Sequence, residues 1–176
     1  SPADLKGLKM RSQESEVHMA MYKTYGATAI QKPMTEVLAA LNSGSIDGLD
    51  NTALFINAGG LSEPLKYFTL TRHIYQPACI VYSKKWFDTL PADLQAIVMD
   101  VKDLGAPGRR DIRAMEGEMM DLFEDFDVEV IELSGAEREA FAKPARAMHD
   151  SFAATIDGGP ALLQKIRASL KAKRGK

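Results

Sequence analysis

The chain has 176 residues, of which 45% are hydrophobic and 26% are charged, which is typical of a globular protein rather than a disordered one. Its length suits one ordinary domain or two small lobes that share segments. The 22 lysines and arginines nearly balance the 24 aspartates and glutamates, so the formal net charge is −2. That balance gives no electrostatic reason to expect a nucleic-acid partner.

Cysteine and histidine usage argues against a disulfide framework and against a metal site. The chain has one cysteine, Cys79, and its three histidines are far apart without metal-ligand spacing. It also lacks a glycine-rich phosphate loop, so we expect neither a metal ion nor a cofactor. Apolar runs such as residues 78–82 are far too short to cross a bilayer. Residues 1–6 lack the apolar segment of a signal peptide, which we expect to be absent from this chain.

Two hydrophobic periods alternate over the first fifty residues. Short alternating segments at 8–12, 27–31 and 45–49 indicate strands. The segments between them, 14–25 and 34–41, carry apolar residues at helical spacing and end near glycines. This order predicts a βαβαβ unit with a parallel sheet covered by helices.

The middle of the chain changes character. Aromatic and β-branched residues predict strands at 66–71 and 78–82, and we expect the Cys79 thiol to be buried and inert within the second strand. A long helical pattern starts at Pro91, where a missing N–H costs nothing. Residues 105–108 interrupt that pattern, which predicts either two helices or one helix kinked near Pro107.

The last part of the chain reads as strand, long helix and short helix. Strict alternation predicts a strand at 127–133. Ser134 is a candidate N-cap, with Glu137 three residues on as in a capping box. A final helix is expected at 162–170, and the basic tail, residues 171–176, is interpreted as a solvated helix end.

Two polar side chains stand where strands of the predicted sheet end. Arg11 ends the first strand and Asn51 follows the third. Ligands of open α/β sheets bind outside the carboxyl ends of the strands, and a planar guanidinium there can clamp a carboxylate through two nitrogens. Asn51 offers donors and an acceptor beside that cation. It is equally a candidate N-cap for a helix that starts at Thr52, and the two roles are compatible.

Two other classes of function stay open on the residues alone. Asp47 and Asp50 flank a glycine, and with His73 they could supply the acid and base groups of a small α/β enzyme. Turn carboxylates beside glycine are also commonplace in proteins without activity. The third class is a truncated module whose role is self-assembly.

Six segments, taken in order, are similar to one family of transport receptors. They include Gly-Leu-Lys-Met-Arg at 7–11 and Asp-Gly-Leu-Asp-Asn at 47–51. This ordered set, from residue 4 to about residue 134, resembles the DctP-type solute-binding proteins of tripartite ATP-independent periplasmic (TRAP) transporters. The matching segments are 4–11, 25–27, 36–41, 46–51, 65–73 and 83–91.

The resemblance implies a receptor, not an enzyme, that captures a small organic acid in the periplasm and works with the membrane permease subunits of a TRAP transporter. It places the carboxylate anchor on Arg11, ligand contacts on Asn51 and Met34, and a pocket role on His73. Gln13, which stands beside the anchor where the family has proline, completes the predicted ligand-binding set.

The resemblance also implies a division of the chain, because family members are nearly twice as long. We expect an α/β fold of the type II periplasmic-binding-protein kind, of which this chain holds the second lobe. That lobe comprises residues 1–75 and 115–170. Residues 77–114 are the return segment of an otherwise missing first lobe, with the hinge helix. Exposed edges then predict a homo-oligomer or a rearranged stretch at 77–114.

Overall fold

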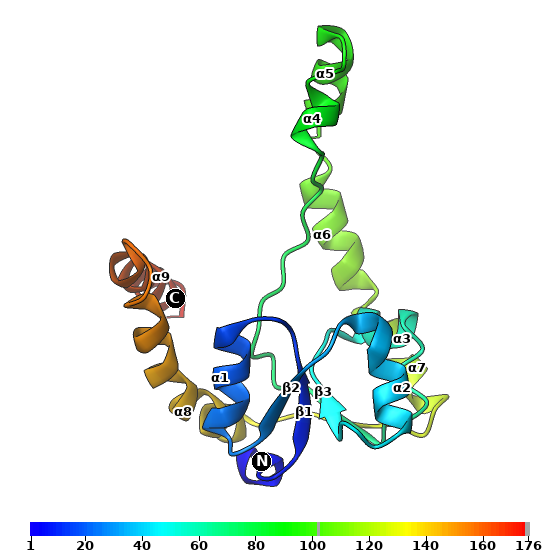
Figure 1. The fold of residues 1–176 in the computed structure, drawn as a ribbon, viewed down its shortest axis with the longest axis vertical. Helices are drawn as coiled ribbons and strands as arrows, with labels where there is room; N and C mark the ends of the chain where they lie inside the picture. The colour runs from blue at the N-terminus through cyan, green and yellow to red at the C-terminus, as the bar shows by residue number, and fades with distance from the viewer. Residues whose placement is uncertain (102, 175–176) are drawn as a thin grey trace.

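A three-stranded parallel sheet lies at the centre of the computed structural model, which describes residues 1–101 and 103–174 (Figure 1). A short 3-10 helix, η1 (Pro2–Leu5), precedes the sheet. Strand β1 (Lys9–Ser12) lies between β2 (Thr28–Gln31) and β3 (Gly48–Leu49), so the strand order is β2-β1-β3. In the register, Arg11 lies opposite Ile30 on one side and Leu49 on the other.

Helices connect these parallel strands, so the predicted βαβαβ unit is confirmed. Helix α1 (Glu16–Thr24) links β1 to β2. The 3-10 helix η2 (Met34–Glu36) and helix α2 (Val37–Asn42) link β2 to β3. Ser15 is the N-cap of helix α1, and its hydroxyl accepts the N–H of His18. The chain leaves the helix through Gly26 at a φ of 76°. A left-handed φ of this kind favours glycine.

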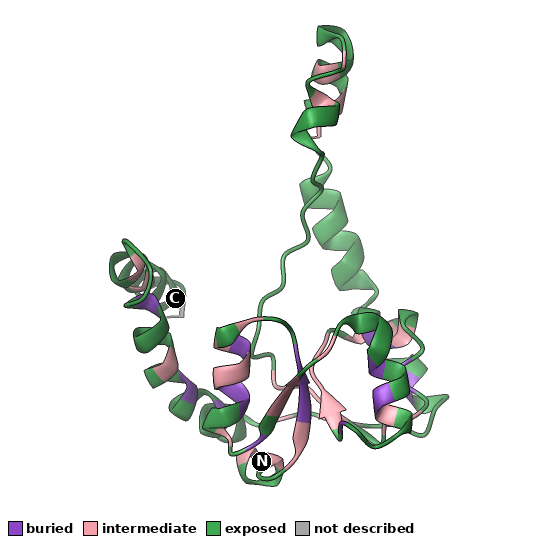
Figure 2. Ribbon diagram, in the orientation of Figure 1, coloured by how far each residue is buried: buried purple, intermediate pink, exposed green. Residues whose placement is uncertain are grey.

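Two separate apolar clusters form the interior. Figure 2 shows buried residues on α1 and β1 and, apart from these, on α2. The smaller cluster lies between helix α1 and the sheet. Its buried members are Met10, Met21, Tyr22 and Ala27. The larger cluster joins helix α2 to the rest of the body. Its buried members are Val37, Ala40, Ile46, Ile56, Leu61, Phe123 and Val128. Successive side chains of a strand point to opposite faces of the sheet, so the strands contribute to both clusters. Helices are therefore required on both faces of the sheet.

A second, two-stranded parallel sheet consists of β4 (Tyr67–Thr69) and β5 (Glu129–Ile131). The strands predicted at 66–71 and 127–133 are therefore confirmed, in shorter form. Helices α3 (Ala53–Ala58) and α7 (Glu116–Glu124) pack beside this sheet. Phe68 of β4 stacks on the fully buried Phe123 of α7 with ring centroids 4.5 Å apart. This stack ties the second sheet to the larger cluster.

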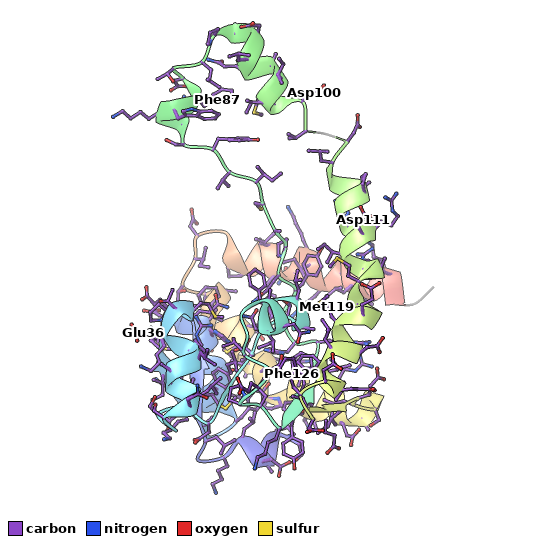
Figure 3. The ribbon with its side chains drawn as sticks, turned by 90° about the vertical axis from the view of Figure 1, so that its right-hand side faces the viewer. Glu36, Phe87, Asp100, Asp111, Met119 and Phe126 are labelled. Carbon is purple, nitrogen blue, oxygen red and sulfur yellow. The ribbon has the colours of Figure 1, made fainter. Side chains whose placement is uncertain are left out.

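An arm projects from the body between β4 and α7 (Figures 1 and 3). It carries helices α4 (Lys84–Phe87), α5 (Ala92–Met99) and α6 (Gly105–Ala114). Figure 3 shows Phe87 and Asp100 near the far end of the arm, away from Phe126 in the body.

The strand predicted at 78–82 is wrong, because this segment has no regular structure and no partner strand among the described residues. Its apolar side chains Ile80 and Val81 are exposed. The prediction of a buried Cys79 thiol is wrong for the same reason, since the thiol is exposed. A strand needs a neighbour to satisfy its backbone, and sequence pattern alone does not supply one.

The helical pattern that starts at Pro91 and continues to Phe126 forms three helices, α5, α6 and α7 (Glu116–Glu124), so the prediction of two helices or one kinked helix is wrong. The first break lies before Gly105 rather than at residues 105–108. Pro107 occupies the third position of α6, where backbone N–H groups have no partner within the helix. The proline therefore starts the helix instead of interrupting it.

Helices α8 (Gly135–Ala153) and α9 (Gly159–Arg174) end the chain. The predicted capping box is confirmed: Glu137 Oε2 accepts the N–H of Ser134, and the Ser134 hydroxyl accepts the N–H of Glu137. Tyr25 donates its hydroxyl to the carbonyl of Phe141 at 2.8 Å, which attaches α8 to the end of α1. Residues 175–176 of the predicted basic tail lie outside the described residues. Among the described helices, none combines the length and apolar character needed to cross a bilayer.

Candidate functional site

The carboxyl ends of β1, β2 and β3 meet at one edge of the first sheet, because all three strands run parallel. Arg11 reaches this edge from β1. Lys32 follows β2, and Asp50 and Asn51 follow β3. The edge therefore combines a cation with carboxylate and amide groups.

Arg11 is held firmly, and its terminal nitrogens remain free to bind. The residue is 6% exposed, and its Nε donates to the carbonyl of Lys32 at 2.9 Å. Among the described residues, no acceptor pairs with Nη1 or Nη2. No side-chain nitrogen in the described chain is both fully buried and unpaired, so these two atoms reach the surface. A guanidinium that is anchored through Nε and open at both Nη atoms suits an anion with two oxygens.

Asn51 and Met34 lie together at the same edge. Asn51 Nδ2 is 3.7 Å from the Met34 sulfur, and Asn51 Oδ1 accepts the N–H of Thr52 at 2.9 Å. The N-cap of α3 is Thr52, whose hydroxyl accepts the N–H of Phe55, so Asn51 precedes the cap. The alternative that made Asn51 the N-cap is wrong by one residue.

Asp50 is the centre of a hydrogen-bond network that sequence reasoning missed. His18 Nε2 lies 2.7 Å from Asp50 Oδ1, and the Tyr22 hydroxyl donates to the same oxygen at 2.6 Å. His73 Nε2 lies 3.3 Å from Asp50 Oδ2. His18 and Tyr22 are one turn apart on α1, so this helix presents both to one carboxylate. The signal that the sequence offered for this network was a pair of polar residues, four positions apart, on an otherwise apolar face of the helix.

The network keeps Asp50 ionised. Burial raises the pKa of Asp50, but the hydrogen bonds from His18, His73 and Tyr22 together outweigh burial, so this pKa lies well below its ordinary value. Burial first, and then the charge of Asp50, raise the pKa of Tyr22 well above its ordinary value. Asp50 therefore accepts hydrogen bonds and does not hold a proton for catalysis near neutral pH.

The carboxylates proposed for an enzyme do not converge. Asp47 lies before β3, at the amino end of the sheet, where its Oδ2 accepts the N–H of Lys9 at 2.7 Å. Asp50 lies at the carboxyl end. His73 contacts Asp50 but not Asp47, and its Nδ1 is 2.6 Å from the Thr71 hydroxyl. The arrangement does not supply a pair of tuned acid and base groups.

Gln13 contributes through its backbone. Its side chain is exposed and has no hydrogen bond in the described part of the chain, whereas its N–H donates to His18 Nδ1 at 3.2 Å. The structure thus brings Arg11, Asn51 and Met34 to one edge, with His73 joined to it through Asp50.

The two best-defined surface hollows lie away from this edge, one lined by residues 63–67 with Phe126, Asp127 and Glu129, and the other by residues within 118–125. In residues 1–101 and 103–174, no three histidine, cysteine, aspartate or glutamate side chains are grouped to hold a metal ion. What the edge can do chemically is hold an anion.

Comparison with known proteins gives the family of this parallel α/β chain. The family model described as bacterial extracellular solute-binding protein, family 7 (DctP), matches residues 1–155, so the chain belongs to that family. Members of this family are transport receptors and not enzymes.

Relatives and solved structures agree with this assignment. The chain is 31% identical to the 2,3-diketo-L-gulonate-binding periplasmic protein of Escherichia coli K12, over 94% of this chain and 51% of that protein. A TRAP periplasmic solute-binding protein from Sulfitobacter, solved with bound β-D-galacturonate, superposes with a TM-score of 0.84 at 27% identity, over 92% of this chain and 53% of that one.

A third similar protein is the TRAP solute-binding protein of Sulfurospirillum deleyianum, solved with bound succinate. It superposes with a TM-score of 0.87 at 25% identity, over 95% of this chain and 55% of that one. The expected α/β fold of periplasmic solute-binding proteins is confirmed. The chain spans about half the length of these relatives.

Proposed function

We propose that this chain forms one lobe of a periplasmic TRAP receptor and that Arg11 binds the carboxylate of a small organic acid. The single observation that carries the proposal is the buried guanidinium, fixed through Nε and open at both terminal nitrogens. The named ligands of similar proteins, galacturonate and succinate, are carboxylates. A bidentate arginine–carboxylate pair supplies both affinity and orientation.

The neighbouring side chains complete the ligand contacts. Asn51 directs its amide nitrogen along the edge, where it can donate to a second ligand oxygen after leaving the Met34 sulfur, a weak acceptor. Met34 is partly exposed and offers an apolar surface to the carbon skeleton of the ligand. His73 and Gln13 border the same region through the Asp50 network.

Closure of two lobes over the ligand is the proposed mechanism. Residues 1–75 and 115–170 make up the second lobe, and residues 77–114 are the return segment of the first. The projection of α4, α5 and α6 away from the body supports this division. A ligand shifts the equilibrium toward the closed state only by binding that state more tightly. The membrane permease subunits of the transporter are the proposed partners of the closed receptor.

The exposed arm supports a second proposal, that the isolated chain self-associates. Tyr75, Ile80, Val81 and Ile97 of the arm are each exposed. Exposed apolar side chains in this number favour association with another chain. Light scattering is the test, and a monodisperse monomer whose arm resists proteolysis contradicts the proposal.

A calorimetric titration tests the anchor. With one lobe of the cleft, we expect affinity of about 1 mM for galacturonate, succinate or malate, and none for an uncharged sugar. Arg11→Ala should lower the affinity about tenfold or more, since hydrogen bonds to charged groups contribute about 1.5–3 kcal/mol. Lys9→Ala is the matched control, because it removes a half-buried cation, which donates to the carbonyl of Gly44, from the opposite end of β1. Equal affinity of wild type and Arg11→Ala contradicts the proposal.

A further inference from the structure

Asp50 lies at the same strand edge as the proposed anchor, where a carboxylate is a competitor of the ligand. It follows Leu49, the residue of β3 that lies opposite Arg11 in the register. The charge of Arg11 is close enough to influence the pKa of Tyr22, whose hydroxyl lies 2.6 Å from Asp50 Oδ1. An Asp50 carboxylate with unoccupied lone pairs would attract the guanidinium and cover the nitrogens that an anionic ligand needs.

Three donors already occupy that carboxylate. Tyr22 donates to Oδ1, and His73 contacts Oδ2. The third donor is His18, and its tautomer is assigned by the backbone: Nδ1 accepts the N–H of Gln13, so the proton lies on Nε2 and points at Asp50 Oδ1.

These donors are held in place by packing. The side chain of His18 is 4% exposed, Tyr22 is part of the buried cluster under α1, and the side chain of Asp50 is 13% exposed. The two rings also pack against each other, with centroids 5.3 Å apart. Because α1 presents both donors to the same oxygen, Asp50 is directed toward this helix and away from a pairing with Arg11, and no pair between Asp50 and Arg11 forms among the described residues.

We propose that His18 and Tyr22 are positioning residues that hold the Asp50 carboxylate away from Arg11, so that the Arg11 guanidinium stays free for an anionic ligand. The inference rests on the proposed function, since that function gives the free guanidinium its ligand. The class of ligand is a small carboxylate, and the role of the two residues is to prevent an internal carboxylate from replacing it.

Tyr22→Phe is the most direct perturbation, because it removes one donor with little change in volume. We expect Asp50 to turn toward Arg11 and pair with it. Nitrogen-15 NMR of the arginine side chains reports this pairing without any ligand, since a paired guanidinium rotates slowly and its Nη signals separate. Arg11→Lys assigns the signals. In wild type we expect averaged Nη signals, and in Tyr22→Phe separated ones.

A rescue variant distinguishes positioning from a general loss of structure. The double variant Tyr22→Phe/Asp50→Asn has no carboxylate to compete, so we expect the averaged Arg11 signals of wild type to return. Carboxylate affinity should fall about three- to tenfold in Tyr22→Phe and recover in the double variant. Tyr25→Phe is the matched control, because it removes a hydroxyl from the end of the same helix that bonds Phe141 and not Asp50.

The outcomes separate this inference from the proposed function. Arg11 signals that are the same in wild type and Tyr22→Phe overturn the inference, even if wild type binds carboxylates through Arg11. Separated signals that return to wild type in the double variant support it. Carboxylate binding that survives Arg11→Ala overturns the proposed function, whatever the Arg11 signals show.

Discussion

Replacing Phe123 by alanine should remove much of the stability of the body. The side chain is 0% exposed, stacks on Phe68 at 4.5 Å, and lies in the larger cluster that joins α2, α3, α7 and β5. Truncation of a buried phenylalanine costs about 3–5 kcal/mol, as lost transfer energy and as a cavity. Domains of this size are stable by about 5–15 kcal/mol, so Phe123→Ala should lose a large share of that margin.

Urea unfolding followed by circular dichroism measures this loss. Phe126→Ala is the matched control, because Phe126 lies three residues further along and is 46% exposed. We expect the control to change the free energy of unfolding by less than about 1 kcal/mol. A loss below about 1 kcal/mol in Phe123→Ala would refute the reasoning, because it would mean that the second sheet is not packed on the body through this ring.

Three further changes test other parts of the structure. Gly26→Ala should destabilise the protein by about 1–2 kcal/mol, because φ is 76° and the new Cβ would lie 3.3 Å from Lys6 Cγ; an unchanged melting temperature contradicts this. Ser134→Ala should cost about 0.5–2 kcal/mol through the lost capping box, measured by thermal unfolding, whereas Ser151→Ala inside the same helix should cost less. Asp50→Asn should destabilise the protein at pH 7. Since the folded state lowers the pKa of Asp50, its ionised form stabilises the fold above about pH 3.9, and this contribution is lost as pH falls further. The difference in urea midpoint between wild type and Asp50→Asn should therefore shrink below about pH 4, and an equal difference at pH 7 and pH 3 contradicts the assignment.

Local sequence patterns predicted the elements that have a clear hydrophobic periodicity of their own. The βαβαβ unit follows from alternation and helical spacing over the first fifty residues, and the capping box follows from Ser134 and Glu137. Because parallel strands end at one edge, the positions of Arg11 and Asn51 at strand ends were enough to place them there.

Features that depend on partners distant in sequence were not predictable. Residues 78–82 have the composition of a strand, but a strand forms only beside another, and in the described chain none lies next to them. The network around Asp50 needs the packing of α1 on the sheet. This packing brings His18 and Tyr22 into contact with Asp50, although they lie 32 and 28 positions before it in the sequence. Sequence spacing within α1 shows that His18 and Tyr22 share a face, but not what that face meets.

The central claim is that a carboxylate binds at the carboxyl edge of the first sheet, and amide NMR during a titration with succinate tests it most directly. Perturbed amide signals should cluster at residues 11–13, 32, 34 and 50–52, and the perturbations should disappear in Arg11→Ala. Signals that move instead at the hollows lined by residues 63–67 or 118–125, or that move equally in Arg11→Ala, would contradict the account.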